Sequence, residues 1–268
     1  MIDTRIASFP CKTILVAGKK LAYRESGEGP ALALLHGIGS GSASWLFQLE
    51  SLRAHHRVIA WDAPGYGESD CFAIEKPHPQ DYARALSVLL SALQVKSFLL
   101  VGQSLGGLMA ASYARMFPTL AGMLLISPAG GYSGNHESVK DRLKTLDQLG
   151  PDGLAEKRAA GMLSPDPPPI ALELVRWNYR RIRPDGYRQA AYCLANGNIR
   201  EDAASYKGKV LVACGSADTI TPEAGCREIA NAFPLAAYRS LPGLGHASQA
   251  EGPELVNQMI REFGDEAA

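Results

Sequence analysis

The chain has 268 residues, with 27 Lys and Arg against 27 Asp and Glu, so its formal net charge at neutral pH is zero. That balance argues against a general binder of nucleic acids or anionic membranes, because such a protein needs an excess of basic residues. Hydrophobic residues make up 46% and charged residues 20%, which is typical of a globular protein and excludes a disordered one. We therefore expect neither a nucleic acid nor a membrane among its partners.

The sequence shows no sign of export or of membrane insertion. It also shows no sign of a fold held together by disulfides or by a structural metal ion. No run approaches 18 apolar residues, and the opening MIDTRIASFPCK lacks the basic and apolar regions of a secretory signal. The five cysteines are odd in number and form no C-x-x-C pair, and the histidines form no H-E-x-x-H. We expect a cytoplasmic protein that contains no metal site and needs no cofactor.

Strand and helix patterns alternate through the first half of the chain. Continuous apolar runs that end at Gly-rich turns suit strands covered on both faces by helices. The predicted strands are residues 13–17, 21–25, 31–35, 57–61, 97–101 and 122–127. The predicted helices among them are residues 44–52, 80–93 and 105–117. This alternation predicts parallel βαβ units.

The segment 128–206 has a different pattern, with frequent Pro, Gly and charge and no strand signal. Because a structureless loop of this length is improbable, we interpret it as a helical cap. Its predicted helices are residues 136–149, 152–162, 169–182 and 184–196. The α/β pattern then resumes with strands at 210–214 and 236–240 and helices at 222–232 and 251–263. The prediction is one α/β core, formed by 1–127 and 207–268, with the cap inserted at 128–206.

A nucleophile motif follows the fifth predicted strand. Gly102-Gln-Ser104-Leu-Gly106 matches G-x-S-x-G, in which the chain turns so sharply from strand to helix that bulky neighbours of the serine would clash. Here the motif lies between a buried strand and the helix 105–117. The other interpretation is a Gly-rich turn that happens to hold a serine. The context favours Ser104 as a nucleophile.

A serine hydroxyl needs a base and an orienting acid, which follow in the chain order Ser, Asp or Glu, His on this architecture. Downstream of Ser104 the histidines are His136, in the cap, and His246, in a turn after the last strand. Elimination selects His246 as the base. Asp218 directly follows the strand 210–214 and is selected as the acid, with Glu223 as a fallback. Taken alone, Asp218 reads as a turn or capping residue.

The reaction also needs donors for the oxyanion. We predict that the backbone N–H of Leu105, after the nucleophile, is one of them. The other is expected from the Gly-rich loop 36–41, at the N–H of Ile38. His36 is interpreted as a brace of this loop rather than a proton carrier.

These motifs together resemble the α/β-hydrolase superfamily, over residues 12 to 264. The matching pieces are HGIGSG at 36–41, WDAPGYGESD at 61–70, VGQSLGG at 101–107, CGSADTITP at 214–222 and PGLGHASQAEGP at 242–253. The resemblance implies an α/β-hydrolase fold, an eight-stranded, mostly parallel sheet with helices on both faces and an inserted helical cap between strands six and seven. It also implies Ser104, Asp218 and His246 as the catalytic triad.

Within the superfamily the chain is similar to small esterases, enol-lactonases and ring-cleavage C–C bond hydrolases. HGIGSGSASW resembles the H-G-x-G-P-G...W pattern of the last group. Ser40 replaces its usual Pro, Leu46 and Phe47 stand where an Asn is common, and Ala247 follows His246 where a Trp is frequent. These departures place ester or lactone hydrolysis ahead of C–C cleavage.

Three further residues are candidates for substrate contact. Trp45, beside the oxyanion loop, either walls the acyl pocket or fills the core. Gln103 precedes the nucleophile and is otherwise a tolerated polar residue. Arg180 belongs to a basic stripe on a cap helix; it either binds a substrate carboxylate or lies on a solvated face, which we favour.

The sequence therefore predicts a serine hydrolase acting on a small carboxylic ester, lactone or enol-lactone through an acyl-enzyme. One alternative is C–C hydrolysis of a vinylogous diketone, in which the histidine assists tautomerisation. The other is a non-catalytic ligand-binding protein, because fold alone does not fix function. The expected partner is a small-molecule substrate, and the expected assembly is a monomer or a homodimer.

Overall fold

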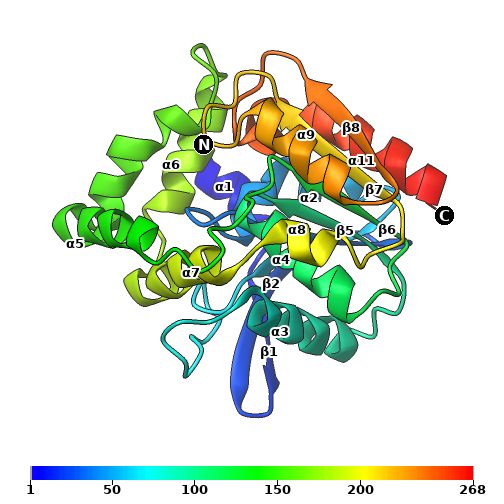
Figure 1. The fold of residues 1–268 in the computed structure, drawn as a ribbon, viewed down its shortest axis with the longest axis horizontal. Coiled ribbons are helices and arrows are strands. Elements are labelled where there is room, and N and C mark those ends of the chain that lie inside the picture. Colours follow the sequence, from blue (N-terminus) through cyan, green and yellow to red (C-terminus); the bar gives the residue numbers. More distant parts are fainter. Residues whose placement is uncertain (1, 268) are drawn as a thin grey trace.

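The structure, a computed structural model, describes residues 2–267 and is built around one eight-stranded sheet (Figure 1). The strand order is β1-β2-β4-β3-β5-β6-β7-β8. The strands are β1 (Lys12–Val16), β2 (Lys19–Ser26), β3 (Ala31–Leu35), β4 (Arg57–Asp62), β5 (Phe98–Gln103), β6 (Gly122–Ile126), β7 (Val210–Gly215) and β8 (Ala236–Leu241). β2 pairs antiparallel with β1 and β4, and every later pairing is parallel. The predicted mostly parallel eight-stranded sheet is confirmed.

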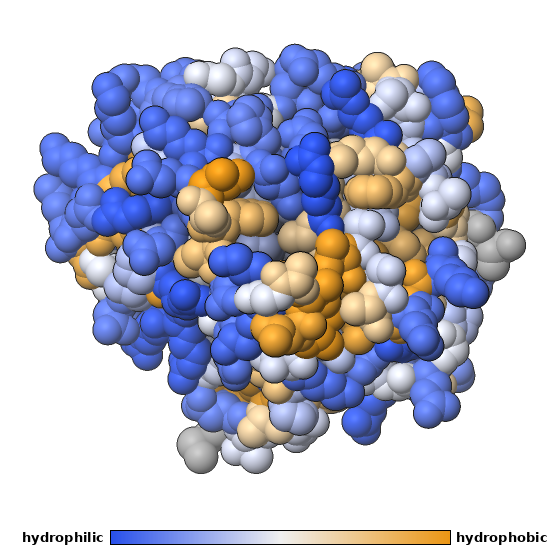
Figure 2. Space-filling view, turned by 90° about the horizontal axis from the view of Figure 1, so that it is seen from below, coloured by the Kyte–Doolittle hydropathy of each residue, from blue (hydrophilic) through white to orange (hydrophobic). Residues whose placement is uncertain are grey.

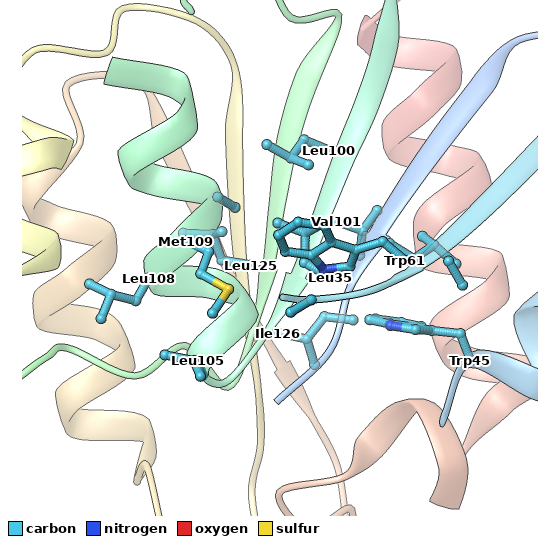
Figure 3. Packing of buried hydrophobic residues seen from close by; sticks show 14 of the residues in the cluster. Leu35, Trp45, Trp61, Leu100, Val101, Leu105, Leu108, Met109, Leu125 and Ile126 are labelled. Atoms are coloured by element: carbon cyan, nitrogen blue, oxygen red, sulfur yellow. The ribbon is translucent and has the colours of Figure 1, made fainter. Parts of the chain in front are cut away.

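Helices cover both faces of the sheet. α2 (Leu46–Leu52) packs against α11 (Pro253–Ala267), whereas α3 (Pro79–Ala92), α4 (Leu105–Met116), α8 (Ile199–Ala203) and α9 (Glu223–Ala232) form a second packed series. Figure 3 shows Leu105, Leu108 and Met109 of α4 on one side of the strands and Trp45 on the other. Parallel strands that are buried on both faces have nearly continuous apolar sequences, as β5 and β6 do.

The chain between β6 and β7 is helical. It contains α5 (Glu137–Arg158), the 3₁₀ turn η2 (Ala160–Met162), α6 (Pro169–Tyr179) and α7 (Pro184–Asn196), followed by α8. α5 packs on both α6 and α7, beside the sheet in Figure 1. α5 is interrupted at Gly150, which has φ +62° and precedes Pro151, so it is two helices joined at a kink.

Short helices complete the chain: α1 (Ile2–Ala7), the 3₁₀ helix η1 (Ser42–Trp45) and α10 (Ser248–Glu251). Within the described residues, no helix is long and apolar enough to cross a membrane. Figure 2 views the side toward which the β1–β2 hairpin projects in Figure 1, and apolar side chains gather on part of this mainly hydrophilic face. A groove between the hairpin and α3 is lined by Val16, Leu21, Phe72 and Val88, among others.

Candidate active site

Ser104 occupies a strained position between β5 and α4. Its φ of 54° and ψ of −118° lie where residues other than glycine are rare. The turn is fixed because Ser104 N–H donates to Ile126 O at 3.0 Å, and Ser104 O accepts from Gly107 N–H at 2.9 Å. A strained serine held by its neighbours' backbone is the geometry of a nucleophile elbow.

The glycines on either side of Ser104 are required by close backbone packing. A Cβ on Gly102 would lie 2.4 Å from Gly106 O, and a Cβ on Gly106 would lie 2.2 Å from Leu35 O. Both separations are far below van der Waals contact, so no larger side chain fits without moving backbone. The spacing of the G-x-S-x-G motif therefore reflects the packing of α4 against β3 and β5.

His246 and Asp218 form a buried pair. His246 Nδ1 lies 2.8 Å from Asp218 Oδ2, and the two residues are 2% and 5% exposed. Asp218 Oδ1 also accepts from the backbone N–H groups of Ile220 and Thr221, at 2.8 and 3.0 Å, and Oδ2 accepts from the Thr221 hydroxyl at 2.9 Å. Because an ionised carboxylate only accepts, Nδ1 carries the proton and Nε2 is left as the basic nitrogen.

The electrostatics of Asp218 favour its charged form. Burial raises the pKa of this carboxyl, but the hydrogen bond and charge of His246 and the backbone N–H of Thr221 outweigh burial and lower the pKa to about 2. Asp218 is thus an anion at neutral pH. An anion in this position can hold an imidazole in one tautomer and orientation, as the acid of a serine-hydrolase triad does.

The backbone around His246 is held by three separate parts of the chain. Gly245 N–H donates to Glu251 Oε2 at 2.7 Å, Ala247 N–H donates to Met162 O at 2.8 Å, and the Gln103 amide donates to His246 O at 3.0 Å. The anchors belong to α10, to the cap and to the elbow. The position of the imidazole therefore depends on the cap as well as on the core.

The loop after β3 lies against the nucleophile. A Cβ placed on Gly37 would be 3.2 Å from Ser104 Cβ, and Tyr66 donates its hydroxyl proton to Ile38 O at 2.6 Å. His36 Nε2 accepts from Ala63 N–H at 3.1 Å, so the proton resides on Nδ1, which donates to Gly37 O at 2.8 Å. His36 is thus a neutral brace between the loop and the chain after β4.

The two expected oxyanion donors have no competing acceptor. Among the hydrogen bonds of the described residues, neither the Ile38 nor the Leu105 N–H is a donor, and the first residue of a helix has no partner within its helix. Ile38 lines the same cavity as Ser104 and His246, and Leu105 begins α4 directly after Ser104. Free N–H groups beside a nucleophile can bind the developing negative charge of an acyl-transfer reaction.

Ser104 and His246 open onto one cavity of about 260 Å³ between core and cap. The core contributes residues of the loop 37–40 together with Gln103, Thr221 and Gln249. The cap contributes mainly Arg142, Arg158, Met162, Leu174, Val175, Asn178, Tyr179 and Leu194. The volume suits a small substrate, and the mixture of apolar walls with a few polar groups is typical of a ligand pocket.

A model of the alpha/beta hydrolase family matches residues 32–259, which span strands β3 to β8 and every motif described above. The chain belongs to the alpha/beta hydrolase family. A 2-hydroxy-6-oxononadienedioate/2-hydroxy-6-oxononatrienedioate hydrolase of Comamonas testosteroni is 27% identical over 262 residues, which cover 91% of each chain.

Solved structures agree with this assignment. A thermophilic esterase from Thermogutta terrifontis, crystallised with malate, superposes with a TM-score of 0.87 at 25% identity, covering 96% of this chain and 99% of that one. The enol-lactonase from Burkholderia xenovorans has the same fold, with a TM-score of 0.86 at 24% identity over 94% of this chain and 99% of that one. The alpha/beta hydrolase thus resembles esterases, enol-lactonases and C–C hydrolases, as expected from its motifs.

The sequence-predicted substrate residues of this alpha/beta hydrolase lie in different places. Gln103 lines the cavity, but Trp45 is 0% exposed in the core and is not part of the lining. Arg180 also lies outside the lining: its guanidinium pairs with Glu156 at 2.7 Å on the cap surface, as expected of a solvated face. Residues 2–267 contain no group of three or more His, Cys, Asp or Glu side chains arranged to hold a metal ion.

Sequence reasoning missed four residues that shape the site. Tyr66 and Thr221 lie within motifs that were recognised, but their hydroxyls point to Ile38 O and to Asp218 only in the folded chain. Arg142 and Arg158 line the cavity from α5. No sequence signal distinguishes them from the cap's other arginines, because the kink in α5 decides which face turns inward.

Proposed function

We propose that this alpha/beta hydrolase cleaves a small carboxylic ester or lactone through an acyl-enzyme on Ser104. The observation that carries the proposal is that Ser104 at its strained elbow and the buried His246–Asp218 pair meet at one cavity, beside two backbone N–H groups that have no partner. Each group needed for acyl transfer by a serine is then supplied by this chain alone.

The proposed reaction uses these groups in turn. Ser104 Oγ attacks the substrate carbonyl while His246 Nε2 takes its proton, and the Ile38 and Leu105 N–H groups stabilise the oxyanion. His246 then returns the proton to the leaving alkoxide, which departs from an ester or stays attached in an opened lactone. Water, deprotonated by the same imidazole, hydrolyses the acyl-enzyme and regenerates Ser104.

A second candidate is hydrolysis of a C–C bond in a vinylogous diketone. The Comamonas testosteroni relative, named for that reaction type, favours it because it matches 91% of this chain. In that reaction His246 would assist ketonisation of the dienol before water adds to the ketone. The departures at Ser40 and Ala247 from the pattern of that group keep ester or lactone hydrolysis ahead.

A substrate panel separates the two candidates. We expect the purified protein to hydrolyse p-nitrophenyl alkanoates and small lactones, with a rapid nitrophenolate burst that equals the enzyme concentration if deacylation limits turnover. Ser104→Ala should retain the fold and lose about 10⁴-fold or more in kcat. Turnover of a 2-hydroxy-6-oxo-dienoate alone, with no ester or lactone activity, would overturn the proposal in favour of C–C cleavage.

A further inference from the structure

Two arginines give the candidate active-site cavity a positive charge. Arg142 and Arg158 line it, and no Asp, Glu or Lys side chain is among the lining residues that the structure describes. The neighbouring walls are apolar or neutral, among them Met162, Leu174 and Leu194. A guanidinium stays protonated at any physiological pH, so this charge does not depend on titration.

Among the described residues, neither of the two arginines has a carboxylate counterion, whereas most of the other cap arginines do. Arg176, Arg180, Arg181 and Arg188 each pair with an Asp or Glu side chain. Arg183 donates to Ser69 O at 2.7 Å. Within residues 2–267 neither Arg142 nor Arg158 has a carboxylate within ion-pair distance.

Most of their hydrogen-bonding capacity is also unused. Arg142 donates to the hydroxyl of the fully buried Tyr187 at 3.1 Å, which fixes one end of its guanidinium. Arg158 Nε is buried and has no partner among the described residues. An arginine carries five N–H donors, and leaving a buried charge and its donors unpaired costs free energy.

The kink in α5 brings both side chains to the same cavity. Arg142 and Arg158 are sixteen positions apart, and a straight helix would separate them by about 24 Å. Sixteen positions of a straight helix also turn by about 160°, so the two side chains would lie on nearly opposite faces. The left-handed Gly150 and the following Pro151 break the helix between them, so each half of α5 contributes one arginine.

We propose that Arg142 and Arg158 form an anion subsite, and that the substrate carries a carboxylate remote from the carbonyl attacked by Ser104. Two guanidinium groups match a carboxylate because both oxygens accept charge-assisted hydrogen bonds in the plane of the fork. The ligand's charge would replace the counterion that the protein does not supply. The inference rests on the proposed function and narrows its substrate to an anionic ester or lactone.

Matched esters test the subsite. Mono-p-nitrophenyl adipate and p-nitrophenyl hexanoate differ only in a terminal carboxylate against a methyl group, and p-nitrophenyl 6-aminohexanoate carries the opposite charge. At pH 7.5 we expect kcat/KM for the adipate ester to exceed that for the hexanoate by about 10- to 100-fold, the effect of one or two charge-assisted hydrogen bonds. The amino ester should be the poorest substrate.

Variants of the two arginines test whether Arg142 and Arg158 cause the preference for the adipate ester. Arg158→Gln and Arg142→Gln should each lower kcat/KM for the adipate ester by about 10-fold or more and change that for the hexanoate less than threefold. Arg180→Gln, which removes a paired arginine outside the cavity, is the control and should keep the full preference. If Arg142→Gln unfolds, because Tyr187 loses its partner, Arg158→Gln decides. Equal kcat/KM for the adipate and hexanoate esters in the wild type would overturn the subsite while leaving the esterase proposal intact.

A binding measurement keeps the two proposals separate. Ser104→Ala should bind adipate, measured by calorimetry at low ionic strength, and the double variant Ser104→Ala/Arg158→Gln should bind it at least about 10-fold more weakly. If no ester is turned over yet this difference appears, the proposed esterase function fails and the anion subsite stands. If Ser104→Ala binds no adipate, the subsite is wrong.

Discussion

At the scale of single residues, the role proposed for Asp218 depends on its charge. Its pKa is about 2, because the hydrogen bond and charge of His246 and the Thr221 N–H outweigh the effect of burial, which raises it. Between pH 4 and 9 this carboxylate does not titrate. Under the proposed mechanism, any loss of activity on the acid side of that range therefore comes from a group other than Asp218.

We predict that Asp218→Asn lowers kcat by about 10³- to 10⁴-fold throughout this range, since the amide holds the wrong imidazole tautomer and supplies no charge. The measurement is a pH–rate series on both proteins with an ester that does not ionise, together with KM, which should change little. A variant with near-normal kcat at any pH from 5 to 8 would remove Asp218 from the mechanism.

His36 links pH to the stability of the oxyanion loop. Burial lowers the pKa of His36, although its bond to Gly37 O and the charge of Asp62 act in the opposite direction. A folded-state pKa below the unfolded one, about 6.5, means that the unfolded chain binds more protons near and below that value. The stabilising contribution is therefore complete above about pH 6.5 and is lost as the pH falls below it.

We predict that the free energy of unfolding by urea falls between pH 7.5 and 5, and that His36→Asn shows a smaller fall. The reason is that a protonated imidazole would turn an N–H toward the N–H of Ala63, whereas an amide has no such change of charge. His136→Gln, at an exposed histidine, is the control and should keep the wild-type pH dependence. An equal fall in the free energy of unfolding of wild type and His36→Asn would refute the role of His36 in this pH dependence.

At the scale of elements, glycines with different surroundings should respond in opposite ways to the same substitution. Gly106→Ala would place a methyl group 2.2 Å from Leu35 O and should destabilise the protein by about 1–3 kcal/mol or more. Gly225→Ala, in α9 with no atom near the new methyl group, should stabilise it by about 0.5–1 kcal/mol. Urea unfolding of the two variants measures both signs. A stable, active Gly106→Ala would mean that the elbow is less tightly packed than described.

The buried Glu251 of α10 connects the cap to the histidine turn. One oxygen accepts from the N–H of Ser164 at 3.0 Å and from its hydroxyl, and the other accepts from Gly245 N–H at 2.7 Å. Because all three groups that contact Glu251 are hydrogen-bond donors, a carboxylate, which only accepts, is the group that satisfies them. The contact explains how a change in the cap can move His246.

We predict that Glu251→Gln lowers the free energy of unfolding by about 1–3 kcal/mol, because the new NH₂ faces an N–H or O–H donor. It should also lower kcat by displacing the turn that carries His246. Glu254→Gln, at an exposed position three residues later, is the matched control and should change neither quantity. Unfolding curves that coincide for Glu251→Gln and wild type would contradict the connection that Glu251 makes between the cap and the histidine turn.

At the scale of the whole molecule, the parts predictable from sequence are those with a strong local pattern. All eight strands appear close to their predicted bounds because apolar runs between glycine turns have few alternatives. The break expected between 149 and 152 is the Gly150 kink. The helices α1, α8 and α10 were missed because four to six residues are too few to show a helical period.

The unpredicted parts depend on long-range packing. Trp45 is an apolar residue next to the oxyanion loop, and only the fold shows that its ring is enclosed by the core rather than turned to the cavity. Arg158 and Arg180 both belong to the cap, and the path of the cap helices determines that one lines the cavity while the other meets Glu156. Local sequence determines that a cap exists, but it does not determine which side chains face the substrate.

The claim that Ser104 is a nucleophile activated by His246 and Asp218 is tested most directly by covalent labelling of the folded protein. A fluorophosphonate reacts far faster with an activated serine than with other side chains, so intact-mass spectrometry should show one adduct on the wild type, located by digestion to the peptide containing Ser104. Asp218→Asn should label far more slowly, and Ser104→Ala should not label. An unlabelled, folded wild type would favour a non-catalytic ligand-binding protein, and labelling of Ser104→Ala at the wild-type rate would contradict the assignment of the nucleophile.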